Sequence, residues 1–304
     1  MEQYFLEEIR ICDLCGNSRL EIEFEVDDCT LLRCGRCGLV FTSPRYTEEY
    51  LKGMYSKKYY EKAPGYLSAQ LQQPPEDLCR LALSIKKRFT GRTRGRALRS
   101  LDVGCGAGSA VAAFKRAGWE AIGIDMSETA INAGKGQDLD LRALEIADIA
   151  PQSFDVVTAF HVLEHVSSPR QFLNQCAMRL VPQGILVIDV PNYGSRNARN
   201  LRQHWPNLYP RLHLYQFTAA TLKTYLARLN LEKLSMEKVN GYGPAEDYTS
   251  VPGAHLRPRN RIKETLQKYR HMLFLVPGAK PFLRWLFWQV LGYGESIRVL
   301  CRKN

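Results

Sequence analysis

The sequence predicts an α/β fold built on a parallel sheet that helices cover on both faces. From Ala97 onward, short apolar runs alternate with amphipathic runs, which is typical of strands alternating with helices. The first apolar run ends in the glycine-rich turn Gly104-Cys-Gly-Ala-Gly108, a tight connection from a strand into a helix. A chain of 304 residues, 45% of them hydrophobic, is long enough for one such domain with appendages.

The individual elements follow from where these runs begin and end. The predicted strands cover residues 98–103, 120–125, 139–143, 154–160 and 185–190, and the predicted helices cover 109–117, 127–134 and 169–180. Residues 231–239 and 296–302 are the last two strands. Ligands of such open sheets bind at the carboxyl ends of the strands, so the turns there are where we expect the site.

The stretch from Leu98 to Gly108 predicts a nucleoside site. Its glycines let a ligand lie against the backbone, and the following helix offers free N–H groups at its N-terminus. The next strand ends in Asp125, and a carboxylate there suits the two hydroxyls of a ribose. The spacing G-x-G-x-G differs from the dinucleotide fingerprint, and Asp102 would repel a pyrophosphate but suits a ligand with an ammonium group.

LDVGCGAG therefore resembles motif I of the class I methyltransferases that depend on S-adenosylmethionine (SAM). The resemblance covers about residues 98–234 and the last strand. It implies a Rossmann-like sheet whose last two strands are antiparallel, and SAM as the cofactor. The cofactor-binding positions that it implies are Asp102, Gly104, Cys105, Gly106, Gly108, Asp125, Met126 and Phe160.

A second region, SFDVVTAFHVLEHV (153–166), resembles the ubiquinone-biosynthesis-like O-methyltransferases. His161 and His165 follow the end of a strand, which predicts that at least one of them lies at the pocket; a structural role remains open for each. HVLEH also fits the H-x-x-E-H pattern of zinc proteases, but that pattern belongs on a long helix. The end of the third strand, LRALE, lacks the acidic residue of many relatives, so we do not expect Glu145 to bind the cofactor.

A third region, WPNLYPRLHLYQFT (205–218), resembles a segment that covers the active site in the same relatives. It follows the fifth strand and carries His213 among apolar residues. A polar side chain in such surroundings needs either a buried partner or a function. His213 and His161 are the candidates for a catalytic base, with a buried structural role as the alternative for each.

Residues 1–45 contain two C-x-x-C pairs with eighteen residues between them, which matches four-cysteine zinc sites. The predicted ligands are Cys12, Cys15, Cys34 and Cys37. EIEFEV between the pairs and LVF after them alternate like strands, so the segment resembles a zinc ribbon. Four thiolates leave no open coordination position, which predicts a structural zinc ion. The isolated cysteines are expected to be packing residues.

Residues 46–96 read as a helical cap and linker. The segment is rich in tyrosine, and in class I methyltransferases this region often caps the SAM pocket, so Tyr59 or Tyr60 is a candidate to line it. Simple packing of an amphipathic helix is the alternative. GRTRGR (91–96) reads as a mobile basic linker.

Residues 97–304 form the predicted methyltransferase domain, with an insert at 240–295 between the last two strands. Its first half contains the basic run LRPRNRIK and its second half the apolar run PFLRWLFWQVLG. The apolar run is shorter than the roughly 20 residues that span a bilayer. Basic residues beside tryptophan and phenylalanine favour contact with a membrane surface, with a dimer interface or core packing as alternatives.

The net charge of +11 is concentrated in two stretches, 86–99 and 252–294. Such local basic faces suggest an anionic partner: a membrane surface, or less favourably a nucleic acid. The N-terminus lacks an apolar run with a basic flank, so we expect no signal peptide. We therefore expect a cytoplasmic protein, peripheral on the inner face of the cytoplasmic membrane. The sequence leaves the oligomeric state open.

The predicted function is SAM-dependent methyl transfer to a hydroxyl of an amphiphilic small molecule, such as a lipid, a quinone precursor or a lipid-linked sugar. One alternative is an RNA methyltransferase, which the ribbon and the basic charge favour. Against it, His161-Val162 stands where enzymes that methylate exocyclic amines carry an N/D-P-P-Y motif. A non-catalytic SAM-binding protein is the other alternative.

Overall fold

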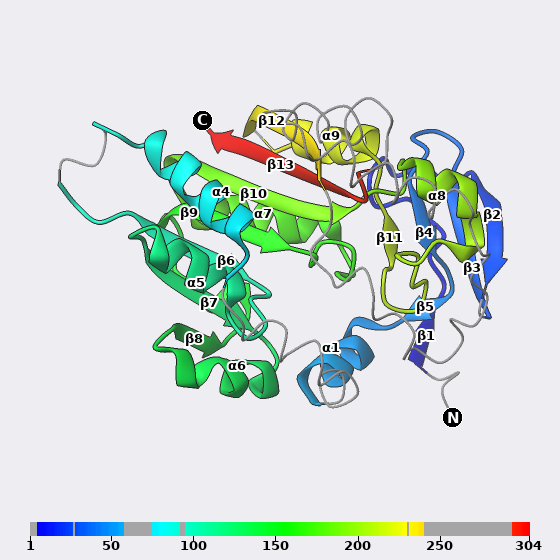
Figure 1. Ribbon diagram of the computed structural model, residues 1–304. Helices are drawn as coiled ribbons and strands as arrows, with labels where there is room; N and C mark the ends of the chain where they lie inside the picture. The colour runs from blue at the N-terminus through cyan, green and yellow to red at the C-terminus, as the bar shows by residue number, and fades with distance from the viewer. Residues whose placement is uncertain (1–4, 27, 58–73, 92–94, 230, 240–293) are drawn as a thin grey trace, which may run out of the picture.

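The computed structural model describes residues 5–26, 28–57, 74–91, 95–229, 231–239 and 294–304. Figure 1 shows a large sheet flanked by helices, with a smaller sheet beside it. No helix in the described ranges is long and apolar enough to cross a membrane. Tyr59, Tyr60 and all but the last two residues of the predicted insert lie outside the described residues.

The large sheet has seven strands in a doubly wound order with one reversal. From edge to edge these are β12 (Leu231–Val239), β13 (Ser296–Lys303), β10 (Leu180–Pro191), β9 (Phe154–Phe160), β6 (Arg99–Val103), β7 (Glu120–Asp125) and β8 (Asp140–Ala143). Strands β8, β7, β6, β9 and β10 are parallel, and β13 is antiparallel to both of its neighbours. The predicted Rossmann-like sheet with two antiparallel last strands is confirmed.

Helices cover both faces of this sheet. An apolar core lies on each face of the sheet. Alternate side chains of β10 enter one core or the other, because successive residues of a strand point to opposite faces. Ile185 and Val187 pack in the core beneath α4 (Glu76–Lys87) and α5 (Ser109–Arg116). Leu186 and Ile188 pack in the other core, beneath α7 (Pro169–Arg179) and α9 (Ala219–Ala227). Both faces are therefore apolar, as the continuous apolar run from Ile185 to Ile188 predicts.

Local signals explain where the helices begin. Ser127, Ser168, Ser195 and Thr218 each accept a hydrogen bond from a backbone N–H in the first turn of the helix that follows. These helices are α6 (Glu128–Gly134), α7, α8 (Arg196–Leu201) and α9. The predicted basic linker ends in an anchored residue, since the guanidinium of Arg96 lies 2.7 and 2.5 Å from the two oxygens of buried Asp155.

The small sheet is the core of the predicted ribbon. Its order is β11 (Tyr215–Gln216), β4 (Val40–Thr42), β3 (Cys29–Cys34) and β2 (Leu20–Val26). The strands expected near 21–26 and 39–41 are present, and β3 lies between them. A separate pair joins β1 (Leu6–Glu7) to β5 (Arg45–Tyr46), which leads into α1 (Glu48–Lys57). The end of the ribbon at residue 45 stays a prediction. The small sheet extends beyond that residue, because its edge strand β11 comes from residues 215–216.

The first C-x-x-C turn docks on the helices of the large sheet. The two carboxylate oxygens of Asp13 accept hydrogen bonds from the hydroxyls of Ser168 and Tyr225, each at 2.9 Å. The next residue, Leu14, is fully buried, and its carbonyl accepts a hydrogen bond from Arg170 at 3.1 Å. The ribbon and the large sheet therefore share one continuous apolar core.

The docking of Asp13 predicts a clear difference between two aspartates of the ribbon. Asp13→Asn places an amide N–H₂ against a hydroxyl donor, and we expect the free energy of unfolding to fall by about 1–3 kcal/mol. Asp28→Asn is the matched control, because the Asp28 side chain is 96% exposed and 3.7 Å from Arg211. Denaturant unfolding measures both, and an equal loss in the two variants would contradict the docking role.

Candidate functional site

The glycine-rich turn connects β6 to α5 in a conformation that other residues rarely adopt. The φ angles are 71° at Gly104, 54° at Gly106 and 95° at Gly108. A Cβ on Gly104 would lie 2.4 Å from Cγ2 of Val162, and one on Gly108 would lie 2.8 Å from Cδ1 of Leu139. Both backbone angle and space therefore require glycine, and the loop after β9 rests directly on this turn.

Asp125 at the end of β7 faces the same turn. One of its carboxylate oxygens accepts the Gly106 N–H at 2.9 Å, and the other accepts the Ser127 N–H at 2.8 Å. Burial raises its pKa, although these two bonds oppose the shift. Each oxygen keeps a further lone pair, so the carboxylate can still accept hydrogen bonds from a diol.

Asp102 at the carboxyl end of β6 is buried beneath the turn. One of its oxygens accepts a hydrogen bond from the Thr158 hydroxyl at 2.6 Å. Burial raises its pKa to about 7, against the effect of that bond and with a contribution from the charge of Asp125. A cation bound beside it would lower this pKa and favour the carboxylate form.

The other predicted cofactor positions lie around this turn with different exposures. The Cys105 thiol points into the core, where a Cβ on Gly123 would lie 2.7 Å from its sulfur, so its backbone alone is left to face a ligand. Met126 is 40% exposed and borders a hollow of about 350 Å³ at the ends of β7 and β8. Phe160 is half-buried, with the Arg298 guanidinium 5.7 Å from its ring centroid. The cofactor contacts of these residues remain predictions.

The hollow is closed on one side by α1. Lys52 of this helix forms an ion pair with Glu145 at 3.0 Å, and both residues line the hollow. Glu145 therefore already has a cationic partner. Helix α1 thus lies at the carboxyl edge of the sheet. It belongs to the segment 46–96, which the sequence predicts to be a cap and linker.

His161 lies between two carboxylates at the carboxyl edge of the sheet. Its Nδ1 is 3.3 Å from Oε1 of Glu164, and its Nε2 is 3.8 Å from Oδ1 of Asp189. Burial lowers the pKa of His161, but the two carboxylates outweigh burial and raise it. Arg298 pairs with the other oxygen of Asp189 at 2.8 Å. This surrounding charge favours the protonated imidazolium at His161.

His213 has the opposite environment. Its Nδ1 lies 2.7 Å from the carbonyl oxygen of Asn207, and a carbonyl can only accept, so Nδ1 carries the proton. Burial lowers the pKa of His213 to about 3, so the ring is neutral at physiological pH and Nε2 is left unprotonated. Its ring lies 4.7 Å from that of His165 in an edge-to-face arrangement.

His165 is held from two sides. Its Nδ1 lies 3.0 Å from the Leu212 carbonyl oxygen and 2.8 Å from the Tyr55 hydroxyl. Burial lowers its pKa. His165 and His213 therefore lie next to each other, and Tyr55 of α1 contacts His165.

Glu164 completes this cluster as a buried carboxylate. Neither of its oxygens accepts a well-formed hydrogen bond from the part of the chain that the structure describes. Burial raises its pKa, but His161 and the neighbouring histidines outweigh that and lower it to about 2. Ligand atoms of Glu164, His165 and His213 lie within 4.8 Å of one another, so these three side chains could also hold a divalent cation.

Sequence reasoning does not single out Glu164 or Asp189. A local pattern could have indicated both residues. Glu164 follows the predicted strand 154–160 and Asp189 lies near the end of the predicted strand 185–190, at the edge of the sheet where the site is expected. Their importance depends on histidines that approach from elsewhere in the chain.

The four predicted zinc ligands come together. The sulfur atoms pair as Cys12 with Cys37 and Cys15 with Cys34, at 3.5 Å in both pairs. All four sulfurs lie within 4.8 Å of one another. Tetrahedral zinc with bonds of about 2.3 Å needs sulfur separations of about 3.8 Å, so the donor set and its spacing fit this ion.

The two C-x-x-C turns have the same geometry. Gly16 and Gly38 follow the second cysteine of each turn, and both have a φ of 72°. The Gly16 N–H donates to the Cys12 carbonyl at 2.8 Å, and the Gly38 N–H donates to the Cys34 carbonyl at 2.9 Å. Burial raises the pKa of the Cys34 thiol, but hydrogen bonds led by the Cys37 N–H lower it to about 6. Burial raises the pKa of the Cys37 thiol to about 11, so this turn favours a thiolate at Cys34 and not at Cys37.

Comparison with known proteins assigns this arrangement to a family. Residues 69–236, which run from the segment before α4 into β12, match the family model described as a methyltransferase domain. The chain belongs to the methyltransferase domain family. The matched range contains the glycine turn and the histidine cluster, so the predicted class I methyltransferase fold is confirmed.

Relatives and solved structures agree with this assignment. The chain is 41% identical over 102 residues to a ubiquinone biosynthesis O-methyltransferase from Rhodopseudomonas palustris strain HaA2, which is 31% of this chain and 40% of that methyltransferase. The corresponding protein of Bradyrhizobium sp. strain ORS 278 is 38% identical over the same shares. The chain thus spans less than half of these relatives' length. The plantazolicin methyltransferase BpumL in complex with SAH has a TM-score of 0.50 at 15% identity, covering 84% of this chain and 94% of that one.

The position of Asp125 predicts its effect on SAM binding. Asp125→Asn removes a charged acceptor, and we expect SAM affinity to fall by about 1.5–3 kcal/mol, roughly tenfold to a hundredfold. Asp140→Asn on the neighbouring strand is the control, since Asp140 is exposed and pairs with Arg142 at 2.8 Å. Calorimetric titration with SAM measures both variants. Unchanged affinity in Asp125→Asn would refute the ribose contact.

The four-thiol site predicts about one zinc ion per chain in the purified protein. Cys12→Ser should lose the metal and unfold at lower temperature, because the metal links two separate turns. Cys79→Ser, on α4 and outside the site, should keep both metal and stability. Mass spectrometry of the native protein and thermal melts test this, and a metal-free wild-type chain would disprove the site.

Proposed function

We propose that the chain is a SAM-dependent methyltransferase that methylates a hydroxyl group, with His213 as the base. The observation that carries this proposal is the neutral His213 ring, tied at Nδ1 and unprotonated at Nε2. Methyl transfer from a sulfonium is a direct displacement, so the protein has to align the acceptor and remove its proton. The free nitrogen can accept that proton, but a pKa of about 3 makes His213 a weak base, so the proton has to leave as the methyl group is transferred and not before.

The histidine cluster lies close to the cofactor turn. Val162, within the His161–His165 segment, rests on Gly104 of that turn. Both ends of the segment border Glu164, and His165 contacts the His213 ring. This proximity supports a reaction site between the glycine turn and His213.

His161 is less suited to the same role. It lies between Glu164 and Asp189, which outweigh burial and raise its pKa, so the protonated form, which cannot act as a base, is favoured more than in a free imidazole. When protonated, His161 offsets the charge of the two buried carboxylates.

Each residue then has one task in the proposed reaction. SAM supplies an activated methyl group when bound. Asp125 holds the ribose hydroxyls, Asp102 lies where an ammonium group would be held, and the glycine turn allows close approach of the backbone. Nε2 of His213 takes the hydroxyl proton as the methyl group is transferred, and the charge of Glu164 offsets part of the burial that disfavours the imidazolium.

For the acceptor we propose an amphiphilic small molecule at a membrane surface. The similarity to ubiquinone biosynthesis O-methyltransferases supports a hydroxyl acceptor. The basic and apolar insert of residues 240–295 supports contact with anionic lipid. Retention on anionic vesicles against retention on RNA separates this proposal from an RNA methyltransferase.

A bound cation is a second mechanism that one observation favours. Glu164, His165 and His213 place three potential ligand atoms together in a buried site. A divalent cation there would lower the pKa of the acceptor hydroxyl and replace the base. Metal content decides between the two: a second metal per chain that His213→Ala removes, while the four-cysteine metal stays, supports the cation.

The base assignment predicts a separation of turnover from SAM binding. His213→Ala should lower kcat by about 10²–10⁴-fold while leaving SAM affinity unchanged, because proton transfer occurs only along the reaction path. His204→Ala is the matched control, since His204 is exposed and directly precedes the segment that carries His213. Single-turnover methylation of phenols and lipid-linked alcohols, beside SAM titration and thermal melts, measures these effects. If His161→Ala is crippled and His213→Ala is not, the base is His161.

A further inference from the structure

We propose that the metal in the four-cysteine site is a clamp that positions the loop carrying His213. This inference rests on the proposed function for the role of His213, but the clamp itself is a statement about contacts. The first knuckle is defined as residues 12–15, the second knuckle as residues 34–37, and the His213 loop as residues 205–216. The metal ligands come equally from the two knuckles.

The first knuckle is fixed to the body of the domain. Asp13 accepts hydrogen bonds from Ser168 at the start of α7 and from Tyr225 of α9. The Leu14 side chain is fully buried, and its carbonyl accepts hydrogen bonds from Arg170 and Arg228. Both helices pack on the large sheet. The first knuckle therefore has a fixed position relative to the glycine turn.

The second knuckle is connected to the His213 loop instead. It leads directly into β4, which pairs with β11 of that loop, and Figure 1 shows these two strands side by side. The buried Thr42 of β4 makes two bonds that flank His213 in sequence. Its N–H donates to the Leu214 carbonyl at 3.0 Å, and its hydroxyl donates to the Pro210 carbonyl at 2.9 Å.

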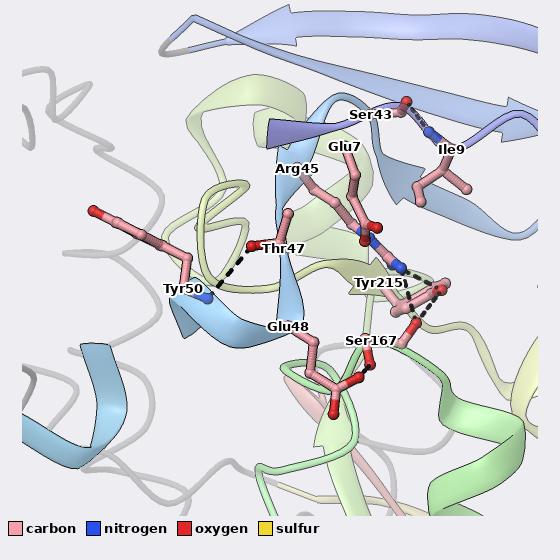
Figure 2. Close-up of polar contacts among 9 residues, drawn as sticks. All are labelled: Glu7, Ile9, Ser43, Arg45, Thr47, Glu48, Tyr50, Ser167 and Tyr215. Carbon is pink, nitrogen blue, oxygen red and sulfur yellow. Dashed lines mark hydrogen bonds and ion pairs between the residues drawn. The ribbon is translucent and has the colours of Figure 1, made fainter. Parts of the chain in front are cut away.

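Arg45 adds a tie between the ribbon and the histidine cluster. Figure 2 shows its guanidinium between Glu7, Tyr215 and Ser167. The distances are 2.9 Å to the Glu7 carboxylate, 2.9 Å to the Tyr215 hydroxyl and 3.0 Å to the Ser167 carbonyl. Tyr215 lies two residues after His213, and Ser167 follows the His161–His165 segment. The ribbon thus contacts both segments that supply histidines.

The metal closes this chain of contacts. Cys12 and Cys15 stand on the fixed side, and Cys34 and Cys37 on the side that holds the His213 loop. Bonds from one ion to all four thiolates link the two sides within a few ångströms. Without the ion, the thiolates repel one another or must take up protons, so the second knuckle keeps only weaker ties to the segment after the first, such as the Gly35 N–H that donates to the Arg19 carbonyl at 3.0 Å. The His213 loop then depends on single hydrogen bonds such as that of the Tyr215 hydroxyl to the Ser167 carbonyl, and we expect it to open more often.

Hydrogen exchange of the full-length chain tests the clamp directly. Zinc is removed with a chelator at neutral pH, and exchange is followed by mass spectrometry in peptides covering 209–217 and 98–108. We expect exchange in 209–217 to accelerate by about tenfold or more, while 98–108 is unchanged and SAM affinity stays within about twofold. Unchanged exchange in 209–217 would overturn the clamp. Equal acceleration in both peptides would also overturn it, because the metal would then be a global fold element.

Thr42 variants test the same link with all four thiols in place. Thr42→Val keeps the shape and loses the hydroxyl, so we expect full zinc content, faster exchange in 209–217 and a lower kcat at unchanged KM for SAM. Thr42→Ser keeps the hydroxyl and should restore wild-type behaviour. If Thr42→Val exchanges like the wild type, the link through β4 is wrong.

The exchange result also separates this proposal from the proposed function. It needs no methyl acceptor and no turnover. A His213→Ala variant that turns over normally would remove His213 as the base, yet the metal-dependent protection of residues 209–217 would stand. If zinc removal leaves exchange in residues 209–217 unchanged while His213→Ala turns over slowly, the clamp is wrong and His213 remains the base.

Discussion

The buried charge of Glu164 is the constraint around which the carboxyl edge of the large sheet is arranged. A carboxylate without well-formed hydrogen bonds is costly to bury, so it must be balanced by cations or by donors nearby. His161 lies beside Glu164 on one side. Asp189 contacts the other nitrogen of His161, and Arg298 pairs with Asp189. His165 and His213 remain neutral on the other side, because burial lowers the pKa of both. Burial and the neighbouring carboxylates thus shift the pKa of His161 upward and those of His165 and His213 downward.

This arrangement divides the edge of the sheet into two chemical regions. At β6 and β7, glycines and two buried carboxylates form the turn that the sequence predicts for the cofactor. At β9 and β10, histidines and a buried carboxylate form a region suited to proton transfer. The contact of Val162 with Gly104 joins the two regions. A substrate between them would meet the cofactor on one side and the base on the other, which is the alignment that a displacement reaction requires.

The ribbon is an integral part of the catalytic domain. Its sheet is completed by β11, a strand from the far half of the chain, and its first knuckle is buried against α7 and α9. A free appendage would expose that knuckle and leave the edge of β4 unpaired. The consequence is that the four-cysteine cluster and the segment that carries His213 share one hydrogen-bonded sheet.

The sequence by itself determined the large sheet, the glycine-rich turn and the four-cysteine cluster, because each depends on local pattern. Strand bounds such as 120–125, 154–160 and 231–239 follow from runs of apolar residues, and the paired C-x-x-C turns carry their own spacing. Only the tertiary structure decided that β11 completes the ribbon, since a two-residue strand has no periodicity to detect. It also decided the direction in which each histidine's pKa shifts. The pKa of His161 depends on burial, on Glu164 and on Asp189, and that of His213 on burial and on the ring of His165, and the burial and the contacts with distant residues are not encoded by sequence spacing.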